Sequence, residues 1–403
     1  MNEFIEREVR LAWPAAMRQA YDVVIIGGGG HGLATAYYLA TRHGLTNVAV
    51  IERGYIGAGN SGRNTTIIRA NYGIPEAVRF YQRSVDLYAG LEAETGRDLM
   101  HRRKGLLWIA HSEAGVRQER ARAEVNTAFG AETTYVGPDE VRRICPELDM
   151  TGQGMWPIYG ASYHAAGATA RHDRVVWAYA EGAMRRGVHV FQRTAVTGLQ
   201  TTGDRVTGVV TTAGPISAGL VLSAAGGHVT TIARMAGVRL PIRTHPLQAF
   251  VTTRYARRFE PIVASSALLV YASQTAKGEM LIGAEIDRQP SYAYDSSHEF
   301  LQGCAFRAIA LLPFLRDLRV LRQWTGLCDM SPDYSPVMGF TGADGFLVTT
   351  GWGTWGFKAI PAGGEQMAEL IATGRMPALI APFALDRFAR DRTMADRGSA
   401  GTH

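Results

Sequence analysis

The chain has 403 residues, 46% hydrophobic and 19% charged, which is the composition of an ordinary globular protein and long enough for two domains. The formal net charge is +6, but the basic residues are scattered and their one tight run is Arg102-Arg103-Lys104, so the charge favours an anionic ligand or an acidic partner and disfavours nucleic acid. Its three cysteines are far apart, so we expect neither disulfides nor a metal site. No apolar stretch reaches the roughly 18 residues of a membrane span, and the first twenty residues lack the apolar core of a secretory signal. We therefore expect a soluble cytoplasmic protein without a membrane anchor.

The first predicted elements form a βαβ unit around a glycine-rich turn. They are a strand, an alanine-rich helix and a second strand, over residues 21–26, 33–39 and 46–51. The turn reads Gly27-x-Gly29-x-x-Gly32, a spacing that brings bare backbone and a helix N-terminus to a pyrophosphate. Glu52, 20 residues after Gly32, ends the second strand, where a carboxylate accepts ribose hydroxyls. The pattern predicts a nucleotide site rather than a bare βα turn, and it leaves open whether the nucleotide is NAD or FAD.

The remaining elements alternate between helical and strand-rich blocks. Helices are predicted over 74–97, 173–186, 297–312 and 362–373. Strands are predicted over 188–191, 206–212, 216–222 and 346–348, and mainly short strands and turns over 98–165 and 244–325. Nucleotide-binding elements thus recur along the chain, which favours an FAD fold. We expect an α/β protein whose FAD-binding Rossmann-like domain (1–97, 166–243 and 326–403) is interleaved with a substrate domain on a largely antiparallel sheet (98–165 and 244–325).

Motifs along nearly the whole chain carry a resemblance to a known family. They are YDVVIIGGGGHGLATAYYLA at 21–40, RNTTIIR at 63–69, HPLQA at 245–249, Lys277-Gly, and GWGTWGFKAIP at 351–361. In this order they resemble the β subunits of heterotetrameric sarcosine oxidases, which belong to the D-amino-acid-oxidase/sarcosine-oxidase superfamily of flavoproteins. The resemblance implies oxidation of a small N-methyl amino acid, with a hydride equivalent passing from the N-methyl carbon to FAD and the electrons then to FMN.

In that family one arginine and one lysine hold the substrate carboxylate over the flavin, and Arg69 and Lys358 stand at the matching positions. A guanidinium fork binds a carboxylate bidentately, and an ammonium adds a point charge. The plainer alternatives are a surface or interdomain ion pair for Arg69 and a solvated side chain for Lys358. The glycine loop over 351–356, with the helix from Ala362, would aim backbone amides at the flavin. The resemblance assigns to FAD Gly27, Gly29, Gly30, His31, Gly32, Glu52, Arg53, Asn60, Ser61, Arg63, Asn64, Thr65, Val196, Ala225, Gly226, Gly353, Thr354, Gly356, Phe357 and Lys358.

The resemblance also implies a second flavin. Its members link FMN covalently to a histidine in a Lys/Arg-His-Asp stretch, which here is Arg171-His172-Asp173. His172 is therefore the expected attachment site, and a helix-capping or packing residue is the plainer alternative. The FMN would face a partner chain, and the family implies α-, γ- and δ-type partner subunits in a hetero-oligomer.

Three positions depart from the pattern of related enzymes. Gly326 stands where monomeric members attach FAD to a cysteine, and Cys328 is two residues out of register, so a noncovalent FAD is expected. Leu281 replaces the lysine that activates oxygen in those enzymes, which suits an FAD that passes electrons to FMN. Trp355 replaces a glycine beside the expected substrate, so an N-methylglutamate dehydrogenase-type subunit is an alternative. An opine- or proline-type dehydrogenase subunit, and a flavin-bearing scaffold without activity, are the other hypotheses.

Overall fold

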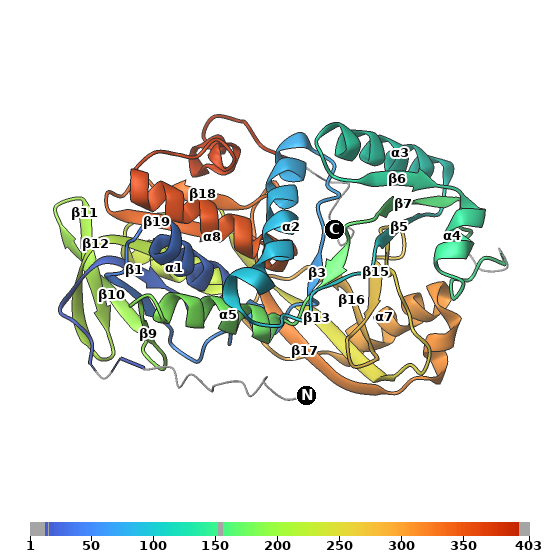
Figure 1. The fold of residues 1–403 in the computed structure, drawn as a ribbon, viewed down its shortest axis with the longest axis horizontal. Helices are drawn as coiled ribbons and strands as arrows, with labels where there is room; N and C mark the ends of the chain where they lie inside the picture. The colour runs from blue at the N-terminus through green and yellow to red at the C-terminus, as the bar shows by residue number, and fades with distance from the viewer. Residues whose placement is uncertain (1–12, 15, 152–155, 395–403) are drawn as a thin grey trace.

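Two eight-stranded sheets, one in each half of the molecule, organise the fold (Figure 1). The structure is a computed structural model that describes residues 13–14, 16–151 and 156–394. Most of the segment considered above for a secretory signal therefore lies outside the described residues, as does the end of the proposed FAD-binding domain. Among the residues that are described, no helix combines the length and apolarity needed to cross a bilayer.

The first sheet has a parallel centre that is buried on both faces. Its order is β10-β11-β12-β1-β2-β9, with β19 beside β12 and β18 beside β19. In β1, Val23 and Ile25 belong to one hydrophobic core and Val24 and Ile26 to another, so this strand is a continuous apolar run rather than an alternating one. The strands are β1 (Ala20–Ile26), β2 (Val48–Ile51), β9 (His189–Phe191), β10 (Val196–Thr202), β11 (Arg205–Thr211), β12 (Gly214–Ser223), β18 (Val337–Phe340) and β19 (Phe346–Thr350).

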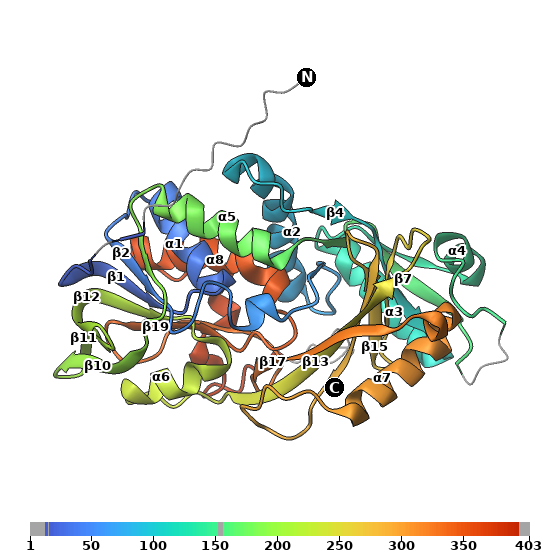
Figure 2. The ribbon, with the colours of Figure 1, turned by 90° about the horizontal axis from the view of Figure 1, so that it is seen from below.

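Four helices pack together on one face of the first sheet and a short helix covers the other, as Figure 2 shows. The four are α1 (Gly30–Arg42), α2 (Pro75–Thr95), α5 (His172–Met184) and α8 (Gly356–Thr373), and the short one is α6 (Val229–Met235). The predicted helices over 74–97 and 173–186 are confirmed as α2 and α5.

Helix α8 begins at Gly356, so the prediction that it starts at Ala362 was wrong. Glycines and a proline lower helix propensity, and Pro361 lies inside α8. A proline removes the donor that would bond to the carbonyl four residues earlier, here that of Phe357. Tyr88 of α2 replaces this donor, because its hydroxyl donates to the Phe357 carbonyl at 2.7 Å.

The second sheet has the order β17-β13-β16-β15-β14-β5-β7-β6, and all its pairs are antiparallel except β14 with β5. The expected largely antiparallel sheet is thus confirmed. Its strands are β5 (Leu106–Ala110), β6 (Thr133–Val136), β7 (Gly160–His164), β13 (Arg243–Arg254), β14 (Ile262–Ser265), β15 (Val270–Gln274), β16 (Glu279–Ile286) and β17 (Val320–Met330). Helix α7 (His298–Leu311) packs on one face, close to the helix predicted over 297–312.

The residue ranges of the two sheets support the proposed division into two discontinuous domains, with β17 running across the proposed boundary at residue 326. A small three-stranded sheet, β3-β8-β4, holds the segment just before Arg69. Its strands are β3 (Ile67–Ile68), β8 (Ala168–Thr169) and β4 (Arg102–Arg103).

Two helices interrupt the block 98–165, where only short strands and turns were predicted. They are α3 (Glu113–Ala128) and α4 (Pro138–Ile144). Helix α3 starts after Ser112, whose hydroxyl accepts the Gly115 N–H at 3.1 Å. Most of the residues that α3 buries are polar, namely Glu119, Arg122 and Asn126. A helix with a polar buried side has no apolar stripe in its sequence, and the prediction was wrong for that reason.

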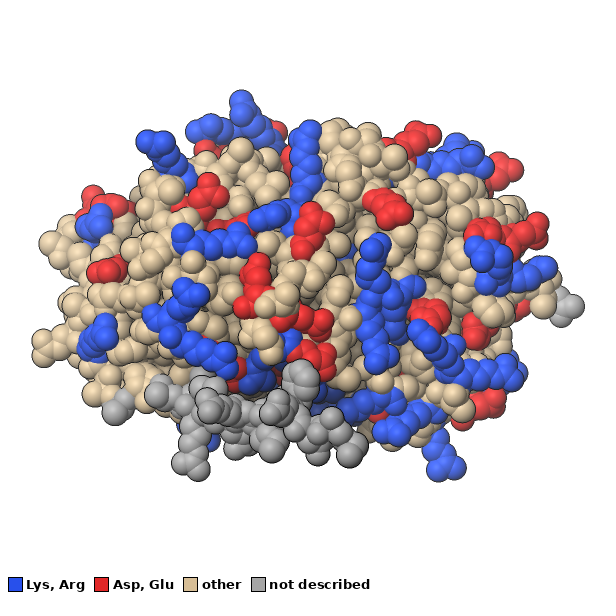
Figure 3. All heavy atoms as spheres, viewed as in Figure 1, with Lys and Arg blue, Asp and Glu red and all other residues tan. Residues whose placement is uncertain are grey.

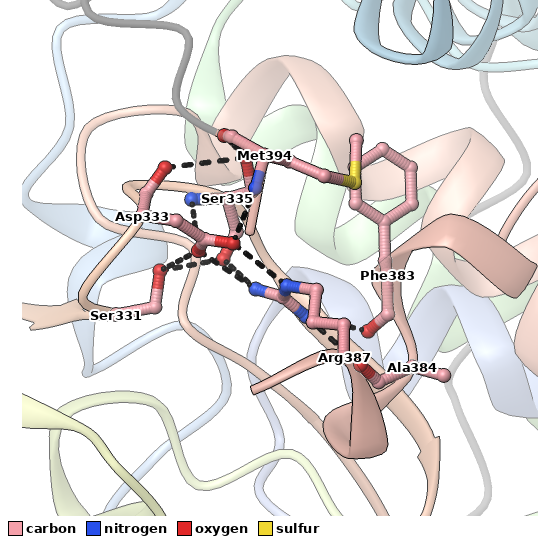
Figure 4. Close-up of polar contacts among 7 residues, drawn as sticks. All are labelled: Ser331, Asp333, Ser335, Phe383, Ala384, Arg387 and Met394. Atoms are coloured by element: carbon pink, nitrogen blue, oxygen red, sulfur yellow. Dashed lines mark hydrogen bonds and ion pairs between the residues drawn. The ribbon is translucent and has the colours of Figure 1, made fainter. Parts of the chain in front are cut away.

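A buried ion pair fixes the C-terminal part of the described chain (Figure 4). Arg387 donates to the two carboxylate oxygens of Asp333 at 2.8 and 2.9 Å. The same carboxylate accepts the Met394 N–H at 2.9 Å. Both side chains of the pair are at most 3% exposed, so removal of one partner alone would leave a buried uncompensated charge.

Charged side chains are interspersed on the face of the molecule shown in Figure 3. Ion pairs among exposed side chains of the described chain include Arg174 with Asp98 at 2.7 Å and Arg205 with Asp344 at 2.6 Å. The excess positive charge is therefore spread over this face and does not form a continuous basic groove on it.

Candidate active site

A cavity of about 600 Å³ is lined by residues of both sheets. The first half contributes the glycine turn, Glu52, Val196 and the first turn of α8, and the second half contributes Trp108 and Tyr271 among others. Of the residues predicted to bind cofactor or substrate, Gly32 and His172 do not border it. Those that do are Gly27, Gly29, Gly30, His31, Glu52, Arg53, Asn60, Ser61, Arg63, Asn64, Thr65, Arg69, Val196, Ala225, Gly226, Gly353, Thr354, Gly356, Phe357 and Lys358.

The glycine turn is fixed by close backbone contacts. Gly27 has φ +116°, and a Cβ there would lie 2.4 Å from the Ala224 carbonyl oxygen. A Cβ on Gly32 would lie 2.2 Å from the Gly27 carbonyl oxygen, so Gly32 acts through packing behind the turn. With α1 starting at Gly30, the turn forms a cradle that brings the bare backbone of Gly29 and Gly30 to the cavity wall. A Cβ on Gly30 would lie 2.2 Å from Cδ1 of Ile360.

Glu52 is held with its carboxylate at the cavity. One oxygen accepts the Gly28 N–H at 2.9 Å and the other accepts the Gly54 N–H at 2.7 Å. A carboxylate oxygen has a second acceptor site, so both oxygens can still accept ribose hydroxyls. The glycine cradle and this carboxylate therefore fit the two ends of an adenosine diphosphate group.

Arg69 presents a buried cation to the cavity. Its side chain follows β3, is 5% exposed, and donates from Nη1 to the Asn71 carbonyl and side-chain oxygens at 2.9 and 3.0 Å. Its guanidinium carbon lies 4.2 Å from the Tyr72 ring centroid and 4.8 Å from that of Trp108. Two aromatic contacts and two hydrogen bonds hold the guanidinium in one orientation.

Lys358 lies on the first turn of α8 and is 7% exposed. Its ammonium donates to the Thr354 carbonyl at 3.0 Å. Burial, and then the charge of Arg69, lower the pKa of Lys358 well below its usual range. The charge of Arg69 disfavours a second positive charge on Lys358, and an anion bound in the cavity they both border would favour the charged form of Lys358. The alternative that Lys358 is a solvated side chain is wrong, because the side chain is buried.

Several polar atoms of cavity-lining residues fit a bound flavin. His31 stacks on Trp352 with centroids 3.9 Å apart, and its Nε2 lies 3.0 Å from the Gly356 carbonyl oxygen. Burial lowers the pKa of His31 to about 3, so the ring is neutral and donates to that carbonyl. Within the described chain, the Trp352 indole N–H and the Thr349 hydroxyl are buried without a hydrogen-bond partner. Such orphaned groups are satisfied by a bound ligand with polar ring atoms.

Sequence reasoning missed cavity-lining residues that long-range pairing brings to the site. Trp108 lies on β5 and Tyr271 on β15, while Thr349 is the last residue but one of β19. Asp329 is buried and accepts the Thr350 hydroxyl and the Gly351 N–H, each at 2.7 Å, so it anchors the glycine loop. No local motif marks these residues, because their positions depend on sheet register.

His172 is separate from the cavity. It is the first residue of α5 and is half-buried, and burial lowers its pKa. Its neighbours form an ion pair in which Arg171 donates to both Asp173 oxygens at 3.0 and 2.7 Å. A group attached here would occupy a site different from the one between the sheets.

Trp355 does not border the cavity, which corrects the expectation that its indole lies beside the substrate. It is 2% exposed and packs 4.7 Å from Tyr72 and 5.9 Å from Tyr81, between ring centroids. Its contact with the site is indirect, because Trp355 packs on Tyr72 and the Arg69 guanidinium lies over the Tyr72 ring. Of the other departures, Gly326 borders the cavity and Leu281 does not.

Within the part of the chain that is described, no group of three or more His, Cys, Asp or Glu side chains is placed to hold a metal ion. The three cysteines are buried free thiols, and Cys328 borders the cavity. Burial raises the pKa of the Cys328 thiol, so it is protonated and has no nucleophilic charge.

Comparisons with known proteins agree with this geometry. The family model for FAD dependent oxidoreductases matches residues 22–370. The chain is 40% identical over 383 residues to sarcosine oxidase subunit beta of Arthrobacter sp, a match covering 95% of each chain. It is 41% identical over 384 residues to the subunit of the same name from Rhodobacter capsulatus, covering 95% of this chain and 92% of the other. Among solved structures, L-proline dehydrogenase from P. horikoshii superposes with a TM-score of 0.89 at 28% identity, covering 94% of this chain and 100% of that one.

Proposed function

Because the chain belongs to the family of FAD dependent oxidoreductases, we propose that it is the catalytic β-type subunit of a sarcosine oxidase-like complex. FAD, when bound, accepts the hydride equivalent removed from the N-methyl carbon, and the imine that remains is hydrolysed to formaldehyde and the demethylated amino acid. The observation that carries the proposal is the buried Arg69–Lys358 pair, which faces the same cavity as the glycine turn. The likeness to sarcosine oxidase subunits along nearly the whole chain supports it.

The residues of the chain supply position and charge rather than acid–base chemistry. The guanidinium of Arg69 would bind the substrate carboxylate, and Lys358 would complete the clamp as it takes up a proton. A clamped carboxylate fixes the N-methyl group against the flavin ring and removes the entropy cost of alignment. Glu52 and the glycine turn would hold the adenosine diphosphate part of FAD, and FAD would be noncovalent because Gly326 offers no thiol at the position used by monomeric relatives.

The cavity has basic side chains in addition to the Arg69–Lys358 pair. Besides Arg69 and Lys358, the cavity is bordered by Arg53 and Arg63. Arg53 contacts His228 at 2.8 Å, and Arg63 donates to the Gly59 carbonyl at 3.1 Å and lies on the Tyr294 ring. Each guanidinium keeps N–H groups outside these contacts, so the observation that favours sarcosine is the likeness to sarcosine oxidase subunits along nearly the whole chain.

A substrate panel tests the proposal. We expect the purified complex, without oxygen, to be reduced fastest by sarcosine, more slowly by N-methylglutamate and proline, with formaldehyde formed from sarcosine. The absorbance of oxidised flavin and a formaldehyde assay measure this. Faster reduction by proline or an opine would instead indicate a dehydrogenase of that type, and no reduction by any amine would indicate a scaffold subunit.

A second flavin is proposed at His172. A half-buried histidine outside the FAD cavity suits a cofactor that lies between this subunit and a partner. The relatives are named as a subunit beta, which supports a multi-subunit complex, and we propose partners of α, γ and δ type. We expect FMN to stay on the unfolded chain, on the peptide that contains His172, while FAD is released. His172→Ala should abolish the retained flavin, measured by fluorescence of the denatured protein. His298→Ala is the matched control, since His298 also starts a helix. Release of all flavin from the wild-type chain would contradict the proposal.

A further inference from the structure

Arg69 is connected to a buried polar group of residues outside the cavity. This group, the α3 cluster, consists of Glu119, Arg122 and Asn126 on α3 and Ser162 and His164 on β7. All five are at most 3% exposed, and none borders the cavity. Polar groups at this depth are costly unless they are hydrogen-bonded or paired.

Trp108 links the α3 cluster to Arg69. The guanidinium carbons of Arg69 and Arg122 each lie 4.8 Å from the centroid of this one indole. The indole is itself held, because its N–H donates to the Ser266 hydroxyl at 2.6 Å. A change at Arg122 therefore alters the surface on which Arg69 is stacked.

The backbone that follows Arg69 in the chain is held by the same cluster. The Ala70 N–H donates to Nε2 of His164 at 3.2 Å, and the Asn126 amide donates to the Tyr72 carbonyl at 2.6 Å. Nδ1 of His164 lies 2.9 Å from the Glu132 carbonyl oxygen, which fixes the neutral tautomer that accepts at Nε2. The segment that carries Arg69 is thus anchored by α3 and β7.

Glu119 completes the cluster by holding Arg122. A carboxylate oxygen of Glu119 lies 3.2 Å from Nη1 of Arg122 and accepts the Ser162 hydroxyl at 2.6 Å. A buried ion pair contributes little to stability compared with apolar residues of the same volume. The presence of the Glu119–Arg122 pair beside Trp108 is explained if the pair fixes the orientation of Trp108, and through it of the Arg69 guanidinium.

We propose that the α3 cluster is a positioning device, which orients the Arg69 guanidinium and thereby sets the affinity of the site for the substrate carboxylate. This rests on the proposed function, in which Arg69 binds that carboxylate. Glu119 and Arg122 are positioning residues that touch neither substrate nor flavin.

Arg122→Lys in the intact complex tests the proposal, because it keeps the charge beside Glu119 and removes the planar group from Trp108. We expect the KM for sarcosine to rise about tenfold with little change in kcat. In a double-mutant cycle with Arg69→Met, the effect of Arg122→Lys should disappear, since it acts only through Arg69. Glu119→Gln/Arg122→Met, which removes both charges together, should raise the KM similarly while keeping the FAD content.

The matched control is Asp333→Asn/Arg387→Met, which alters an equally buried ion pair away from the cavity. It should lower thermal stability and leave the KM unchanged. An unchanged KM in both α3-cluster variants, with a raised KM in Arg69→Met, would overturn the positioning role alone. An unchanged KM in Arg69→Met would instead overturn the proposed function.

Discussion

Replacing Arg69 by methionine is expected to raise the KM for sarcosine by about two to three orders of magnitude. Arg69 is 5% exposed, so a carboxylate that binds to its guanidinium loses its hydration. The positive charge of Arg69 must then compensate for the lost hydration. Truncating one partner of a buried charged pair costs roughly 3–5 kcal/mol, and each 1.4 kcal/mol is a factor of about ten in affinity. Steady-state kinetics of the complex with sarcosine measures the effect.

The Arg69→Met variant carries its own controls. Methionine keeps the length and an apolar stem between Tyr72 and Trp108, so the FAD content should match that of the wild type. A carboxylate-free amine, such as dimethylamine, should react equally poorly with both proteins, because it never uses the clamp. A KM for sarcosine within about twofold of wild type would exclude Arg69 as the carboxylate-binding residue.

The nucleotide half of the site is predictable from sequence because its contacts are local. The turn from β1 to α1 needs a positive φ at Gly27 and close packing at Gly32, and both demands appear as glycines in a fixed spacing. Glu52 is bonded to the neighbouring Gly28 and Gly54. A local pattern of this kind can be read without knowing how the halves of the chain meet.

The substrate half depends on contacts that no local pattern encodes. Helix α3 has a polar buried side, because Arg122 stacks on Trp108 and Glu119 pairs with Arg122. In the first turn of α8, the Phe357 carbonyl accepts a hydrogen bond from the hydroxyl of Tyr88, 269 residues away. Trp355 could not be placed either, since the direction of its indole follows from where α8 begins.

The early start of α8 puts Lys358 on a helix next to Arg69, which leads to a prediction about pH. Without an anion, burial and Arg69 hold the pKa of Lys358 well below its usual range. A bound carboxylate favours the charged lysine and raises that pKa, so binding takes up a proton. The affinity for the carboxylate is then fully present below the pKa that Lys358 has in the free site, and it is lost as pH rises through the higher pKa that Lys358 has when the carboxylate is bound.

Acetate isolates this effect, because it has a carboxylate and no amine to titrate. Above about pH 6, where acetate is ionised, we expect its affinity, measured by perturbation of the flavin spectrum, to fall as pH rises. Lys358→Met should weaken acetate binding about tenfold and remove the pH dependence. Lys104→Met is the matched control, because burial lowers the pKa of Lys104 to about 8 although it does not border the cavity. A wild-type affinity that is constant with pH, or one that still falls with pH in Lys358→Met, would show that Lys358 does not take up the proton.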